Sequence, residues 1–142
     1  IKLNCFKLPL YKEIIMIVRD LNEIINSDLD VSWGNGKSRR FLVRNDNMGY
    51  SLTDTIVEAG TTSLLEYKNH RETCYCIEGE GEVRTANDGQ VFPIKPGIMY
   101  ALNNNDKHYL TAFTTLRLVC VFLPALEGHE AHQLAGEESS CY

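Results

Sequence analysis

Between residues 41 and 123 the sequence alternates short apolar runs with turn-forming residues, and this alternation restricts the fold more than any other feature. Typical breaks are the Asn-Asp-Gly at residues 87–89 and the Lys-Pro-Gly at residues 95–97, where glycine and proline disfavour regular structure. The expected strands cover residues 41–44, 51–59, 62–67, 73–77, 82–85, 90–94, 99–102, 108–113 and 116–123. Many short strands without helices between them predict an all-β sandwich or barrel. The last run, Leu116–Leu123, is nearly all apolar and is expected to be buried.

A short helix is expected ahead of the strands. Asp20 can cap Leu21–Asn26, in which three apolar residues form one stripe. The following stretch, Ser27–Lys37, contains a Trp-Gly-Asn-Gly sequence and is predicted to be a loop. Residues 45–49 are predicted to make a hairpin-type connection.

Length and composition indicate one globular domain. A chain of 142 residues suffices for one full core, and its 44% hydrophobic and 23% charged residues are ordinary for a soluble protein. We expect a single domain over residues 16–134 and a polar tail over 135–142, the chain beyond Pro124 draping over the barrel mouth or fraying. Residues 1–15, which precede a natural-looking start at Met16, are interpreted as an extension or a cloning remnant.

Charge and cysteine usage restrict the partners and the compartment. The net charge of −5 argues against a nucleic-acid surface, and no apolar run approaches the ~20 residues that cross a bilayer. Five cysteines without a disulfide framework, and no secretory signal, favour a reducing cytoplasm. Cys74 and Cys76 point the same way on a strand and are interpreted as packing residues, and Cys120 as a buried, inert thiol.

Two glycine-bounded stretches have the spacing of a paired metal site. The first contains Gly60, Glu66, Lys68, Glu72 and Gly79; the second contains Gly97, Asn103, Asn105 and His108. They resemble the two metal boxes of cupin barrels, the first of which carries histidines where Glu66 and Lys68 stand. Half of the usual ligands are therefore missing, so either the metal has been lost or other side chains replace them.

Glu72, Tyr100 and His108 are the candidate ligands. In a cupin the glutamate and the histidine face inward on neighbouring strands, and Tyr100 can supply a third ligand. Two oxygens and one imidazole suit iron, manganese or zinc. A phenol ionises near pH 10, so it binds as phenolate only if the cation lowers that pKa, which favours iron. The alternative is that Glu72 pairs with an arginine, Tyr100 packs at a strand end and His108 is an ordinary surface histidine.

Other polar residues are candidates for substrate binding and proton transfer. Glu130 and His132 can move protons near neutral pH, although their spacing alone favours a solvated tail. Ser38, Arg39 and Arg40 suit a small carboxylate, with a solvated charge run as the alternative. Finally, two aromatic residues can line a pocket or simply fill the barrel core: Tyr67 and Phe122.

From Met16 to His132 the sequence is similar to the ectoine synthase family of small cupin enzymes. The strongest stretches are residues 75–83 (Tyr-Cys-Ile-Glu-Gly-Glu-Gly-Glu-Val), 93–97 (Pro-Ile-Lys-Pro-Gly) and 118–132, which holds Cys-Val-Phe and Glu-x-His. The resemblance implies a homodimeric, iron-dependent enzyme that closes N4-acetyl-L-2,4-diaminobutyrate into the cyclic solute ectoine and releases water. Iron would be loaded as Fe²⁺, with another divalent metal as the alternative.

The resemblance also implies a role for individual residues. The metal ligands fall on Glu72, Tyr100 and His108, and the proton-handling pair on Glu130 and His132, with Tyr100 also counted as catalytic. The implied substrate contacts are Ser38, Arg40, Thr55, Tyr67, Cys120 and Phe122.

The chain departs from the family at several positions that bear on substrate binding. Asn69 and Arg71 replace a histidine and usually an apolar aromatic residue, and Glu66 stands where the family often has a histidine. Gly36 stands where the family has a tryptophan, and Trp33 lies three residues earlier. The competing interpretations are another cupin enzyme (a dehydratase, isomerase or dioxygenase) and a metal-free ligand-binding cupin.

Overall fold

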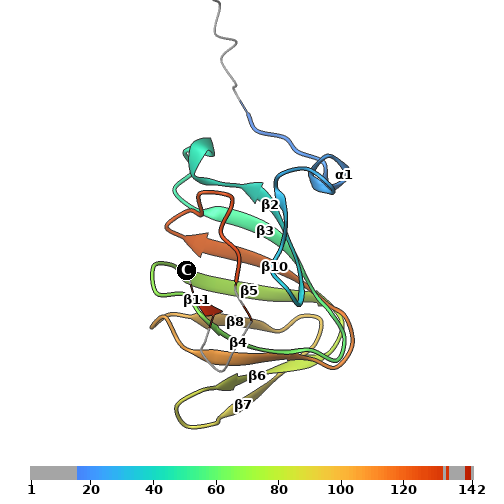
Figure 1. Cartoon of the computed structure of the whole chain (residues 1–142), viewed down its shortest axis with the longest axis vertical. Helices are drawn as coiled ribbons and strands as arrows, with labels where there is room; N and C mark the ends of the chain where they lie inside the picture. The colour runs from blue at the N-terminus through green and yellow to red at the C-terminus, as the bar shows by residue number, and fades with distance from the viewer. Residues whose placement is uncertain (1–15, 133, 135–139, 142) are drawn as a thin grey trace, which may run out of the picture.

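The strands form two facing sheets, antiparallel except for the pairing of β11 with β4, in a computed structural model that describes residues 16–132, 134 and 140–141. The first sheet has the order β1 (Asp30–Ser32), β2 (Gly36–Leu42), β3 (Ser51–Val57), β10 (Leu116–Leu123), β5 (Arg71–Glu78) and β8 (Met99–Leu102). The second has the order β11 (Ser140–Cys141), β4 (Thr62–Glu66), β9 (His108–Ala112), β6 (Gly81–Thr85) and β7 (Val91–Ile94). Figure 1 shows β2, β3, β10 and β5 side by side, with β4, β6 and β7 below them. The predicted all-β class is confirmed.

Helix α1 (Leu21–Ile24) begins as predicted and ends earlier. The Asp20 carboxylate accepts a hydrogen bond from the backbone N–H of Asn22 at 2.7 Å, and Glu23 completes a capping box. The helix ends because Ile25 is extended and Asn26 has a left-handed φ of 64°. None of the helices in the described part of the chain is long and apolar enough to span a membrane.

The loop predicted over Ser27–Lys37 is partly wrong. Asp30–Ser32 forms β1, and Gly36 and Lys37 already belong to β2, which pairs with it. Trp33 donates its backbone N–H to the carbonyl of Gly36 at 3.2 Å, so the glycine-rich sequence is a tight turn of a hairpin.

Side chains alternate between the two faces of the first sheet, and the inner face carries the core. On β10, Leu116, Leu118, Cys120 and Phe122 are buried, while the residues between them point outward. The expectation that this whole run is buried is therefore correct for one face only. Gly79, at the end of the first box, has a φ of 88°, and a Cβ there would lie 2.1 Å from the carbonyl oxygen of Thr115, so the turn requires glycine.

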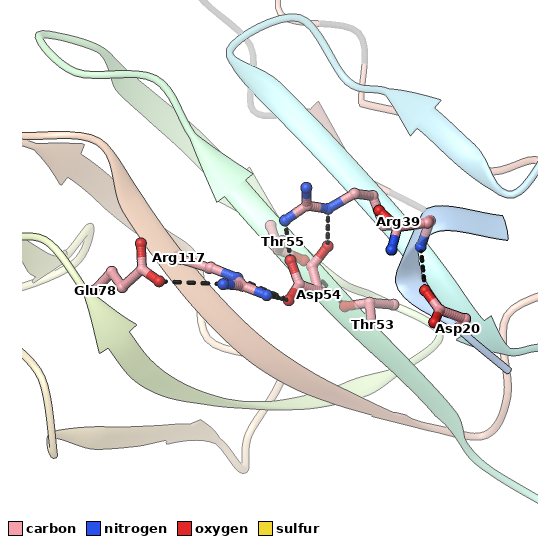
Figure 2. A network of polar contacts seen from close by, with 8 residues as sticks. Asp20, Arg39, Thr53, Asp54, Thr55, Glu78 and Arg117 are labelled. Atoms are coloured by element: carbon pink, nitrogen blue, oxygen red, sulfur yellow. Dashed lines mark hydrogen bonds and ion pairs between the residues drawn. The ribbon is translucent and has the colours of Figure 1, made fainter. Parts of the chain in front are cut away.

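The outer face of the same sheet carries a network of ion pairs. Figure 2 shows Asp54 of β3 between Arg39 of β2 and Arg117 of β10, with Arg117 also paired to Glu78 of β5. The Arg117 Nη2 lies 2.8 Å from Asp54 Oδ2 and its Nη1 lies 3.1 Å from Glu78 Oε1. These contacts connect four strands of the sheet on the side away from the core.

Beyond β10 the chain packs back against the first sheet, so the fraying considered for the segment after Pro124 does not occur at Leu126. Leu126 is fully buried; its N–H donates to Ser51 Oγ, and its carbonyl accepts from the Arg44 N–H, both at 2.8 Å. Of the polar tail expected over residues 135–142, Ser140–Cys141 form β11, which runs parallel to β4. The extension expected over residues 1–15 lies outside the described residues.

Candidate active site

A cavity of about 30 Å³ lies between the sheets, enough space for one water molecule or metal ion. Eight of the eleven site residues predicted from the sequence line it: Ser38, Thr55, Tyr67, Glu72, Tyr100, Cys120, Phe122 and His132. The remaining three, Arg40, His108 and Glu130, are not part of its lining. Trp33 and Cys74, neither of which was predicted as a site residue, also line the cavity.

Glu72 points inward from β5 and is 6% exposed. Burial raises the pKa of its carboxyl to about 7, against the opposing effect of hydrogen bonds from the thiols of Cys74 and Cys120. Glu72 takes part in none of the ion pairs formed by the described residues. The alternative in which it pairs with an arginine is therefore wrong for this part of the chain.

Tyr100 on β8 lies directly across from Cys74 on β5, and its hydroxyl hydrogen-bonds to that thiol. Burial is the largest cause that raises the pKa of Tyr100 well above its ordinary value, and the negative potential of Cys74 and Glu72 adds to it. The phenol thus stays protonated unless a cation binds beside it.

His108 on β9 is 1% exposed, which corrects the alternative of an ordinary surface histidine. Its Nδ1 lies 2.8 Å from the carbonyl oxygen of Asp106, so Nδ1 carries the proton and Nε2 has a free lone pair. That Nε2 is buried and has no hydrogen-bond partner among the described residues. Burial lowers the pKa of His108, and its ring lies 6.4 Å from that of Tyr100. A neutral imidazole with an oriented Nδ1 and an unused Nε2 is what a metal ligand requires.

Asn105, a second-box residue, has a structural role. Its Nδ2 donates to the carbonyl oxygens of Tyr67 at 2.8 Å and His70 at 2.9 Å. It therefore fixes the segment that follows β4 and leads into the strand of Glu72.

His132 is buried, and the alternative in which it belongs to a solvated tail is therefore wrong. Its Nε2 lies 2.9 Å from the hydroxyl of Tyr67. The Tyr67 ring meets the rings of Phe122 at 5.2 Å and His132 at 5.0 Å, both edge to face. Three predicted residues, from β10, the β4–β5 connection and the C-terminal segment, thus form one aromatic wall of the cavity.

Arg40 is fully buried and joins β2 to the C-terminal segment. Its Nη1 lies 3.3 Å from Glu130 Oε2, its Nη2 donates to the Glu130 carbonyl oxygen, and its Nε lies 3.3 Å from Ser38 Oγ. A solvated charge run is therefore excluded for Ser38 and Arg40. Arg39 points to the outer face instead and pairs with Asp54, so the carboxylate-binding role considered for it is not supported.

The Glu130 carboxylate is engaged within its own segment as well. Its Oε1 accepts from the N–H of Glu127 at 2.6 Å and its Oε2 from the N–H of Gly128 at 3.0 Å. Burial acts to raise the pKa of Glu130, but these backbone hydrogen bonds and the charge of Arg40 outweigh it and lower the pKa. Glu130 is thus held as an anion that positions Arg40.

Trp33 forms part of the cavity wall, and the absence of a side chain at Gly36 leaves room for its ring. A Cβ at residue 36 would lie 1.9 Å from the carbonyl oxygen of Ile56 and 3.1 Å from Cζ2 of Trp33, so no side chain fits there. The Trp33 ring lies 6.1 Å from that of His132, and its Nε1–H is buried without a hydrogen-bond partner among the described residues. Trp33 thus supplies an indole to the pocket from three residues earlier in the chain.

Cys74 is the second cavity residue that sequence reasoning missed as part of the site. It is buried as predicted for a packing residue, but its Sγ lies 3.4 Å from that of Cys120 and beside Glu72. Its position two residues after Glu72, on the same face of the strand, was the available signal.

The two facing sheets, with an inward carboxyl, phenol and imidazole near one cavity, define a cupin with a candidate metal centre. Solved structures of similar fold include a protein with a double-stranded β-helix domain from Klebsiella pneumoniae (TM-score 0.58, 18% identity, 78% of this chain and 92% of that chain).

The chain belongs to the ectoine synthase family, whose profile matches residues 16–140. It is 53% identical over 121 residues to the L-ectoine synthase of Oceanobacillus iheyensis, covering 85% of this chain and 94% of that protein. It is 49% identical to the L-ectoine synthase of Halalkalibacterium halodurans over the same shares of both chains. The crystal structure of ectoine synthase from P. lautus superposes with a TM-score of 0.77 at 50% identity, covering 80% of this chain and 81% of that one.

Proposed function

We propose that the protein is a hydro-lyase that closes N4-acetyl-L-2,4-diaminobutyrate into ectoine and water. The family match over residues 16–140, together with L-ectoine synthases about half identical to the chain, carries this proposal. The product is a compatible solute, which connects the reaction to osmotic stress.

The residues that would hold the metal are Glu72, Tyr100 and His108. Two observations support this set. His108 is buried with its Nε2 unused, and the buried Glu72 carboxyl has no cationic side chain paired with it among the described residues. Oxygen and imidazole donors suit Fe²⁺, with another divalent metal as the alternative. A bound cation of this kind supplies Lewis-acid polarisation of the amide oxygen.

Ring closure joins the free amine of the substrate to the carbonyl carbon of its acetyl group. One C–N bond forms, the C–O bond breaks, and the oxygen leaves as water with the two protons of the amine. His132 is suited to accept a proton from the amine and return it to the departing oxygen, because it lines the cavity and is hydrogen-bonded to Tyr67. Glu130 assists as the anion that holds Arg40 in place.

The substrate is bound by the cavity wall. Ser38, Thr55, Tyr67, Cys120 and Phe122 line the cavity, and the charge of Arg40 lies directly behind Ser38. The Trp33 indole N–H is a further donor for the substrate carboxylate. Holding the amine against the carbonyl can supply up to roughly 7–11 kcal/mol of the barrier reduction.

The active unit is proposed to be a homodimer in the cytoplasm. Large apolar side chains lie on the outer face of neighbouring strands of the first sheet, among them Met99 on β8, Tyr75 on β5 and Val121 on β10. Pairing of this face with a second copy would cover them. Free thiols at Cys74, Cys76 and Cys120 agree with a reducing compartment.

The test combines elemental analysis of the purified protein with a ring-closure assay on the acetylated diamino acid. We expect bound iron and formation of ectoine, and loss of both in Glu72→Ala. The exposed Glu80→Ala, in the turn after β5, is the matched control and keeps both. Unchanged turnover of Glu72→Ala without bound metal would end the metal role. Stoichiometric substrate binding without turnover would favour a ligand-binding cupin.

A further inference from the structure

Two thiols converge on the carboxyl group of Glu72. Cys74 on β5 and Cys120 on β10 are direct partners in the strand register, and each is 1% exposed. One ligand atom from each of Cys74, Cys120 and Glu72 lies within 4.8 Å of the other two. In the described part of the chain this is the one group of three histidine, cysteine or acidic side chains arranged so closely.

The separation of the two sulfur atoms suits a shared cation. Two metal–sulfur bonds of about 2.3 Å at a tetrahedral angle place the sulfurs about 3.8 Å apart. The two Sγ atoms lie 3.4 Å apart, so small side-chain rotations open the required gap. All three side chains also line the cavity, which leaves a fourth coordination position open toward it.

We propose that Cys74, Cys120 and Glu72 form a second donor set in this barrel, which binds a thiophilic divalent cation of the zinc class. Two sulfurs and one oxygen are softer than the oxygen and imidazole set of the proposed iron site, so the two sets select different metals. Binding releases the two thiol protons to solvent, and the Tyr100 hydroxyl donates to the Cys74 sulfur that becomes negative.

Sharing of Glu72 makes the two donor sets mutually exclusive. A zinc-class cation held by the thiols withdraws the carboxylate from the iron ligands. This consequence alone rests on the proposed function; the sulfur site itself depends only on the three side chains and the cavity.

Cys76 provides a matched control. It lies on the same strand and the same face as Cys74 and is equally buried. Its thiol is directed to the carbonyl oxygens of Glu78 at 3.4 Å and Gly79 at 3.8 Å, away from Glu72. Cys76→Ser therefore removes a buried thiol without touching the proposed site.

The experiment titrates the reduced, metal-free, full-length protein with Co²⁺ and follows the near-ultraviolet sulfur-to-cobalt charge-transfer band. We expect the band in the wild type and in Cys76→Ser, and its displacement by Zn²⁺. Cys74→Ser and Cys120→Ser should lose about half of its intensity and bind at least about tenfold more weakly. Cobalt binding without the band, or equal bands in all variants, would overturn the proposal.

X-ray absorption on the zinc-loaded wild type keeps the test independent of whether the variants fold. Two sulfur neighbours at about 2.3 Å support the site, and a shell of nitrogen and oxygen alone contradicts it. The ring-closure assay separates the two proposals. Iron-dependent turnover without a sulfur-to-cobalt band would support the proposed function and contradict the sulfur site. A sulfur-to-cobalt band without turnover would support the sulfur site and contradict the proposed function.

Discussion

Asp54 and Glu72 are carboxyl residues of the same sheet with the same exposure, 6%, and they differ in their partners. Asp54 faces outward from β3 and is paired with Arg39 and Arg117. Glu72 faces inward from β5 and has thiols beside it. A buried carboxylate is costly unless a cation accompanies it. For Asp54 the protein supplies the cations as arginine side chains, whereas Glu72 is available to a metal ion from solution. The absence of an arginine or lysine partner among the described residues, rather than burial, therefore marks Glu72 as the functional carboxyl.

The largest effect that follows from this contrast concerns turnover. Glu72→Gln keeps the size of the side chain but cannot become an anion, so we expect ring closure to fall by about a thousandfold, equivalent to roughly 4 kcal/mol of transition-state stabilisation. Steady-state kinetics with iron supplied in excess measure this. Turnover within tenfold of the wild type would mean that Glu72 is no more functional than Asp54.

Asp54→Asn should show the opposite pattern. Removing the carboxylate leaves two partly exposed guanidinium groups facing each other, and we expect a loss of about 2 kcal/mol in the free energy of unfolding. Urea denaturation measures the loss. Turnover per folded molecule should stay unchanged, and a parallel loss of turnover would connect the outer network to the cavity.

Trp33→Phe tests, at a smaller scale, the buried indole N–H that has no hydrogen-bond partner among the described residues. The phenyl ring keeps most of the packing against His132 but removes the indole N–H. A hydrogen bond to a charged group contributes about 1.5–3 kcal/mol, so KM should rise by about tenfold or more with kcat little changed. An unchanged KM would show that this N–H does not reach the substrate.

Glu130, like Asp54, is a carboxylate paired with an arginine, and its titration gives the smallest predicted effect. Its pKa is lowered in the folded state, so its stabilising contribution is present above the unfolded value of 4.5 and is lost as the pH falls through the lower folded value. Glu130→Gln should therefore unfold with a weaker pH dependence below pH 4.5 than the wild type. Thermal melts across that acid range measure the difference, and identical slopes would contradict it.

Local patterns were sufficient to predict much of the fold and part of the site. Leu116–Leu123 was predicted residue for residue because an apolar run between turns has few alternatives. The resemblance to the first cupin box predicted that Glu72 points inward, although the expected strand over residues 73–77 began one residue after it. Cys74 could not be distinguished from a packing residue, because its meaning depends on Cys120 on a strand distant in the sequence. The place of Trp33 likewise depends on the backbone of Ile56, which excludes a side chain at residue 36.

The closure of the barrel by the segment after β10 has a consequence for biosynthesis. Arg40 of β2 is paired with Glu130, and the buried Leu126 donates its backbone N–H to Ser51 of β3. A polypeptide that still lacks residues 124–132 has neither the His132 ring in the cavity wall nor the buried Leu126 packed at Ser51. Competence for chemistry is therefore acquired only after residues 124–132 have been synthesised and have packed against β2 and β3.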